Sequence, residues 1–141
     1  MQRSTPTRNM IVVDSSVFIA ALTNQRGLGE WAGDQVRNPD ILSTELMPAE
    51  VNNALRRMDL TGEITSSDAM RAREEFSAFN LELFSFAKYA DRVWALRRNL
   101  TCYDAWYVAL AEALGCPLVT IDHRLSRATG PECAFVTPPD A

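Results

Sequence analysis

Short apolar runs alternate along this chain with longer segments whose hydrophobic residues recur at helical spacing. The run at 10–13 is apolar throughout, as expected of a strand that is buried on both faces. Similar runs predict further strands at 41–43, 81–86, 118–121 and 134–136. The segments between them predict helices at 17–22, 30–37, 48–60, 66–79, 89–100 and 101–114, and a short one from 122.

Two of these helices have clear start and stop signals. The helix at 48–60 begins at Pro48, which suits a first helical position, and Gly62 follows its end. The helix at 101–114 is followed by Gly115 and Pro117, which end helices. Strands that alternate with helices predict an α/β fold, with a mostly parallel central sheet covered by helices on both faces.

The length of 141 residues predicts one domain. We place it at 10–137, between a flexible N-terminal tail at 1–9 and a C-terminal tail at 138–141. The longest apolar run has seven residues, which is too short to span a membrane, and the first nine lack the apolar stretch of a signal peptide. Three cysteines without a CxxC pair fit reduced thiols, so we expect a cytoplasmic protein.

The formal net charge of −4 argues against a surface coated with positive charge for non-specific nucleic-acid binding. It leaves room for a local basic rim around an acidic site. Thirteen of the fourteen cationic residues are Arg, which coding bias explains as well as function does. Arg nevertheless suits bidentate contacts to phosphate.

Four acidic residues are expected at one edge of the sheet. Asp14 and Asp122 directly follow predicted strands, and Glu50 and Asp104 lie in the first turns of helices that should start at the same edge. Taken alone, each acid is explained by a structural role and needs no catalytic one. It can cap a helix, or it can lie in a first helical turn, where the helix dipole stabilises it by ~0.3–1 kcal/mol. Together, four carboxylates repel one another and need a compensating cation. Because all their ligand atoms are oxygen, Mg²⁺ or Mn²⁺ is the expected ion.

Three segments carry a resemblance to a known family. They are VVDSS at 12–16, PAEVNNALRR at 48–57, and TCYDAWYVALAEALGCPLVTID at 101–122, which an Arg-Leu pair follows at 124–125. The chain resembles the PIN-domain ribonucleases, of the VapC toxin type, from residue 10 to about 136. The third segment is the most specific, because one helix and one strand separate its two acids.

The resemblance implies a metal-dependent endoribonuclease that cleaves RNA, inhibits translation and is neutralised by a small antitoxin protein. It also implies a PIN-like domain that forms a homodimer. By similarity, the catalytic residues that hold the metal are Asp14, Glu50, Asp104 and Asp122.

Other residues are candidates for supporting roles. Ser15, Asn53 and Thr120 could orient the acids or a water molecule, although an N-cap, a surface amide and a strand threonine are equally good readings. Arg124 lies near Asp122 in sequence and could contact RNA. The predicted helix at 17–22 has little polar face, so we expect a partner to cover it.

Two other function classes share such an edge. A receiver-type phosphoacceptor needs an acidic pair after the first strand and a lysine near the last, whereas Asp14 is followed by serines and the only lysine is Lys88. A non-catalytic binding or signalling module on the same fold is the other alternative. Metal-dependent cleavage of RNA, set beside phosphorylation by a small phosphodonor, distinguishes these classes.

Overall fold

The computed structural model describes residues 9–139. The predicted N-terminal tail lies outside the described residues except for Asn9, and the predicted C-terminal tail is described only as far as Pro139. The described chain contains one five-stranded sheet in which every neighbouring pair is parallel, as the sequence predicts. The strands are β1 (Ile11–Val13), β2 (Ile41–Thr44), β3 (Glu82–Phe84), β4 (Leu118–Val119) and β5 (Phe135–Val136).

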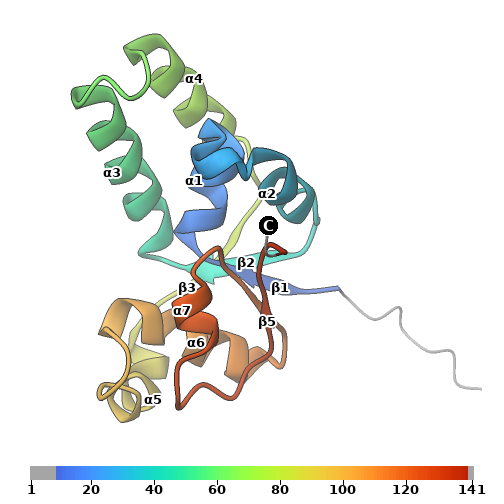
Figure 1. Ribbon diagram of the computed structural model, residues 1–141. Helices are drawn as coiled ribbons and strands as arrows, with labels where there is room; N and C mark the ends of the chain where they lie inside the picture. The colour runs from blue at the N-terminus through green and yellow to red at the C-terminus, as the bar shows by residue number, and fades with distance from the viewer. Residues whose placement is uncertain (1–8, 140–141) are drawn as a thin grey trace, which may run out of the picture.

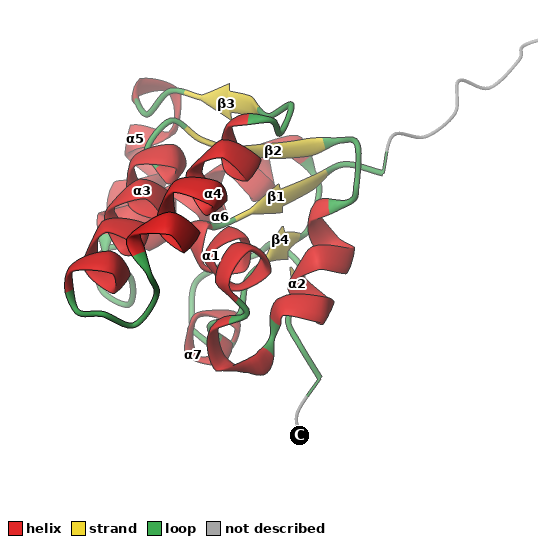
Figure 2. Cartoon of the chain, turned by 90° about the horizontal axis from the view of Figure 1, so that it is seen from above, coloured by secondary structure: helices red, strands yellow, loops and turns green. Residues whose placement is uncertain are grey.

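The strands lie side by side in the order β3-β2-β1-β4-β5, and Figure 2 shows the first four of them in sequence. Helices cover both faces. In Figure 1, α1 (Ser15–Thr23), α2 (Gly29–Val36), α3 (Met47–Leu60) and α4 (Ser66–Ser77) lie on one side of the sheet. On the other side lie α5 (Ala90–Ala95), α6 (Cys102–Leu114) and α7 (His123–Ser126). Short 3₁₀ turns occupy Gln25–Gly27 and Ala87–Tyr89.

The helix predicted at 89–100 is wrong in its length, because α5 ends at Ala95. Thr101, only six positions later, has extended backbone angles and caps α6 with its side chain. A helix that continued to Leu100 would conflict with that extended residue. The strand predicted at 81–86 is also shorter, since β3 is an edge strand that pairs only with β2.

The core lies on both faces of the central strands. Val12 and Val13 of β1 are fully buried, and α6 presents a continuous buried surface from Ala105 to Ala111. This explains why the longest apolar run of the sequence is a helix, since α6 packs against strands and other helices around most of its circumference.

Helix α1 is largely covered by its own chain, and the expectation that a partner covers its remaining half-exposed residues stays a prediction. Val17, Phe18 and Ala20 are buried, and α1 packs against α2, α3 and α4. Phe18 also makes edge-to-face contacts with Phe76 and Phe79, at 5.3 and 5.1 Å between ring centroids. Across residues 9–139, none of the helices has the length and apolar character that a membrane span requires.

Candidate active site

Asp14 is the N-cap of α1 at the carboxyl end of β1. Its Oδ1 accepts hydrogen bonds from the backbone N–H of Ser16 at 3.1 Å and from the Ser16 hydroxyl at 2.5 Å. The nearby Thr120 hydroxyl also favours the ionised form of this carboxyl group and so lowers its pKa. Asp14 is only 7% exposed, and this burial raises its pKa to about 6 although the hydrogen bonds oppose the shift. The ionised form of Asp14 is therefore unfavourable in this buried position.

Asp122 occupies the equivalent place after β4. Its Oδ1 accepts the backbone N–H groups of Arg124 and Leu125 at 2.9 and 3.1 Å, so Asp122 caps α7. Its own backbone N–H donates to the hydroxyl of Thr120 at 3.1 Å. Thr120 is buried and also lies near the Asp14 carboxyl group, so it stands between the two aspartates that follow neighbouring strands.

Asp104 lies in the first turn of α6, where its backbone N–H donates to the Thr101 hydroxyl at 3.1 Å. Its side chain is half-buried. Burial raises the pKa of this carboxyl group, and the negative charges of Asp122 and Glu50 raise it further, whereas Arg124 opposes them. Charges from two other segments, at Glu50 and at 122–124, therefore act on this carboxylate.

Glu50 lies in the first turn of α3 and receives a hydrogen bond from across the site. The Tyr107 hydroxyl of α6 donates to Glu50 Oε1 at 2.5 Å. Burial raises the pKa of Tyr107, and its hydrogen bond to Glu50 raises it further, so this hydroxyl stays protonated as a donor. The charge of Asp14 contributes to the same shift, which places Tyr107 among the acids.

The four acids share one edge without forming a closed ligand set. Within residues 9–139, no three Asp, Glu, His or Cys side chains are grouped closely enough to hold a metal ion as they stand. The donor chemistry nevertheless fits a hard divalent cation, since every candidate ligand atom is a carboxylate oxygen. Burial, with a smaller contribution from neighbouring carboxylates, raises the pKa of Asp14 and of Asp104, so their ionised forms are unfavourable and a cation would stabilise them.

An open pocket of about 520 Å³ adjoins the acids. Asp104 and Asp122 lie on its acidic side, and Arg124 and Arg127 also line it. Hydrogen bonds tie the segments that form its walls. The Asn99 amide donates to Thr129 O at 2.8 Å, and the Arg92 guanidinium, which also pairs with Glu112, donates to Gly130 O at 3.0 Å. The pocket thus combines carboxylates with cationic side chains that could bind phosphate.

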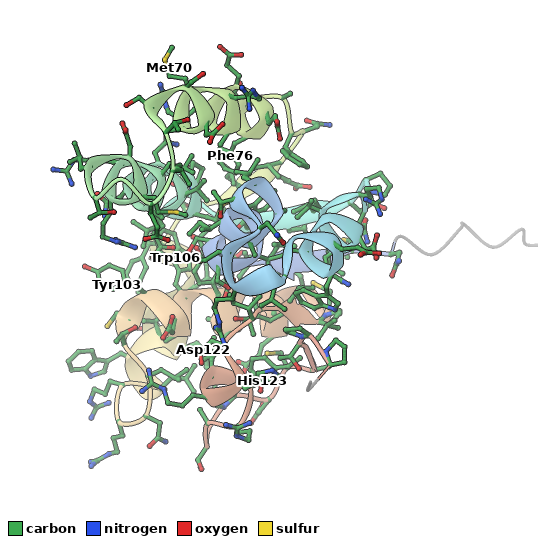
Figure 3. All side chains as sticks on the ribbon, turned by 45° about the horizontal axis from the view of Figure 1, so that its top comes forward. Met70, Phe76, Tyr103, Trp106, Asp122 and His123 are labelled. Carbon is green, nitrogen blue, oxygen red and sulfur yellow. The ribbon has the colours of Figure 1, made fainter. Side chains whose placement is uncertain are left out.

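In Figure 3, Asp122 lies in the middle of the molecule, next to α7, whereas Tyr103 projects from the side. Tyr103 is 62% exposed although it directly precedes Asp104. The helical turn thus separates an outward aromatic ring from an inward acid.

Comparison with known proteins identifies the architecture. A model of the PIN domain matches residues 11–131. The chain belongs to the PIN-domain family. It is 35% identical over 131 residues to VapC ribonuclease Mb0985 of Mycobacterium bovis, covering 92% of this chain and 99% of that relative. It is 34% identical over 123 residues to ribonuclease VapC1 of Mycobacterium tuberculosis, covering 86% and 92%. This PIN domain is therefore of the VapC type, which confirms the resemblance found in the sequence.

Solved structures agree on the PIN fold. PAE2754 from Pyrobaculum aerophilum has a TM-score of 0.66 at 25% identity, with 89% of this chain and 82% of that chain covered. VapBC2 from Rickettsia felis, bound to a DNA fragment from their promoter, has a TM-score of 0.66 at 14% identity, with 91% and 98% covered. A toxin–antitoxin complex from Klebsiella pneumoniae has a TM-score of 0.65 at 19% identity, with 93% and 99% covered. The last two likenesses show the fold alone.

The supporting residues of this PIN domain differ in part from those suggested by the sequence. Thr120 lies between two acids, as its candidate role requires. The serine that bonds Asp14 is Ser16, next to the candidate Ser15, because an N-cap side chain accepts from the residue two positions on. Asn53 is exposed on α3. Tyr107 was not among the site residues predicted from the sequence. Its position three residues after Asp104, one turn along the same helix, could have indicated that its side chain lies near the acids.

The receiver-type alternative gains no support from this PIN domain. Its required lysine could only be Lys88, which lies in the 3₁₀ turn before α5. Lys88 lines a pocket with Leu114, at the carboxyl end of α6, whereas Asp104 stands at the opposite end of that helix. No lysine of the chain is therefore available at the acidic edge.

Proposed function

We propose that this protein is a metal-dependent endoribonuclease that acts as the toxin of a toxin–antitoxin pair, cleaving RNA and inhibiting translation. One observation carries the proposal. Asp14, Glu50, Asp104 and Asp122 come from separate segments to the same side of a parallel sheet, and neighbouring carboxylates contribute to the raised pKa of Asp14 and of Asp104, in a chain whose relatives are VapC ribonucleases. Ligands of open α/β sheets bind at the carboxyl ends of the strands.

PIN-domain nucleases of the VapC type are generally dependent on a divalent metal ion. In this chain Mg²⁺ is the proposed ion and Mn²⁺ the natural substitute, because both prefer carboxylate oxygens. A divalent cation bound here would lower the pKa of a water molecule and stabilise charge on a phosphodiester. The residues that would hold it are Asp14, Glu50, Asp104 and Asp122.

The protein's own part in the reaction is to position charge. Asp14 and Asp122 each use Oδ1 to cap a helix, and this fixes their side chains while leaving Oδ2 without a capping bond. The Thr120 hydroxyl accepts the backbone N–H of Asp122 and lies near the Asp14 carboxylate, so it helps to fix the backbone between the two aspartates. Arg124 lines the same pocket, and this supports a role for its guanidinium in binding an RNA phosphate. No side chain of the chain has to act as the nucleophile.

The partner proposed for this toxin is a small antitoxin protein, and the toxin itself is proposed to be a homodimer. The acidic edge provides a reason for inhibition by a protein, since an Arg or Lys of a partner placed among the four acids would neutralise the same charge as the cation. Such a partner would exclude both the metal ion and RNA. The names of VapC relatives and of solved VapBC proteins support this assignment.

The test is cleavage of total RNA by the purified protein with Mg²⁺, with Mn²⁺ and with excess chelator, followed by sequencing of the new RNA ends. We expect cuts that require the cation and that disappear in Asp122→Asn, where Asn still caps α7. Activity that persists in excess chelator, or equal cutting by the variant, contradicts the proposal.

A further inference from the structure

Tyr107 reaches Glu50 across a long interval of sequence. The two residues are 57 positions apart, on α6 and α3, and the phenol hydroxyl is 2.5 Å from Oε1 of the carboxylate. The ring of Tyr107 is 2% exposed and belongs to the hydrophobic core. A phenylalanine would fill the same space, so packing alone does not account for the hydroxyl.

Thr44 provides a second observation at the same place. It ends β2, is fully buried, and its Oγ1 has no hydrogen-bond partner. The hydroxyl lies close enough to Tyr107 to influence that phenol, although the geometry is not that of a hydrogen bond. A buried hydroxyl without a partner costs about 1–3 kcal/mol, so its position beside the site calls for an explanation.

We propose that Tyr107, supported by Thr44, is a positioning residue that holds Glu50 in the orientation required for binding the divalent cation. This inference rests on the proposed function. The bond to Oε1 fixes the carboxylate and leaves Oε2 available as a ligand. Groups that hydrogen-bond to metal ligands act in this way, and their removal typically weakens metal binding by about 10–100-fold.

The principal test is Tyr107→Phe, which removes one oxygen and keeps the buried ring. Binding of Mn²⁺ to the metal-free protein, measured by calorimetry, is expected to weaken by about 10–100-fold. In RNA cleavage at a fixed low Mn²⁺ concentration, kcat should fall while KM for RNA stays within about twofold. Tyr89→Phe is the matched control, because Tyr89 is also buried but lies in the turn before α5, and it should leave Mn²⁺ binding unchanged.

A double-mutant cycle separates positioning from a general structural effect. In a Glu50→Ala background the group through which Tyr107 acts is absent, so adding Tyr107→Phe should change Mn²⁺ affinity by less than about twofold. If Tyr107→Phe weakens Mn²⁺ binding by the same factor with and without Glu50, the proposal is overturned. Thr44→Val, which replaces the unpartnered hydroxyl with a methyl group, is expected to weaken Mn²⁺ binding less than Tyr107→Phe does. Thr44→Ser keeps the hydroxyl and should bind Mn²⁺ as the wild type does.

The outcomes separate this inference from the proposed function. If the wild-type protein binds Mn²⁺ and cleaves RNA while Tyr107→Phe does both equally well, the positioning role is refuted and the nuclease assignment stands. If the wild-type protein neither binds Mn²⁺ nor cleaves RNA, both are refuted. A melting temperature of the metal-free Tyr107→Phe protein close to that of the wild type would establish that lost binding does not come from unfolding.

Discussion

The charge of Asp14 should destabilise the metal-free protein, and Asp14→Asn is the substitution that reveals it. Asn retains the shape of the side chain and an oxygen that can accept from Ser16, so α1 keeps its cap. What it loses is the ability to ionise. The variant is therefore expected to be catalytically dead and, above neutral pH, more stable than the wild type.

The magnitude follows from the pKa of Asp14. This pKa is raised from 3.8 to about 6, chiefly by burial, so the folded state holds the proton more tightly than the unfolded state does. The resulting stability is fully present below about pH 3.8 and is lost as pH rises through about 6. At 1.36 kcal/mol per pKa unit, the loss is about 3 kcal/mol. Asp14→Asn should avoid it, so its advantage should grow from near zero at pH 4 to about 3 kcal/mol at pH 8.

The assay is urea unfolding of both proteins in excess chelator at several values between pH 4 and pH 8. Taking the difference between the two free energies of unfolding cancels the titration of other groups. Asp91→Asn, which removes one negative charge from an exposed first-turn acid in α5, is the matched control for the change in net charge. A difference between Asp14→Asn and wild type that does not vary with pH would refute the argument that burial penalises this charge. Adding Mn²⁺ should stabilise the wild type and leave the variant nearly unaffected.

Three further outcomes are expected. Asp104→Asn should reduce RNA cleavage by orders of magnitude. It should not lower the melting temperature of the metal-free protein, because it removes repulsion by Asp122 and Glu50. A variant that melts lower yet cleaves at the wild-type rate would show that Asp104 is only a capping acid. At limiting Mn²⁺, cleavage should rise with pH through about 6 as Asp14 loses its proton, and saturating Mn²⁺ should flatten this rise when initial rates are compared. Arg124→Ala should raise KM for RNA severalfold at low salt and much less at 1 M salt, as a screened phosphate contact requires.

The sequence predicted the sheet and the acidic edge well because both depend on local signals. Apolar runs mark the buried strands, and Asp14 and Asp122 follow two of them directly. The parallel order then brings these two residues to neighbouring strand ends. The positions of Glu50 and Asp104 in first helical turns could also be predicted, since Pro48 and Thr101 mark the starts of these helices.

The contacts between distant segments could not be predicted in the same way. The pairing of Tyr107 with Glu50 depends on how α6 and α3 lie across the sheet, and a tyrosine on an apolar helix face looks like core until its hydroxyl partner is known. The covering of α1 by α2, α3 and α4 also required three dimensions, because an apolar helix has the same pattern whether its own chain or a partner buries it.

The hydrogen bonds across the pocket walls have a consequence for conformational entropy. The Asn99 amide binds the Thr129 carbonyl in the pocket wall, and the Arg92 guanidinium binds the carbonyl of the next residue, Gly130, in the protein without RNA. Much of the ordering of these loops is therefore completed during folding instead of being imposed at the moment of binding. A nucleic acid that matches the prearranged walls would bind with little loss of loop freedom, whereas one of the wrong shape would first have to break these bonds. We therefore expect the pocket to select nucleic acids that fit its existing shape, and not to change its loops to fit each substrate.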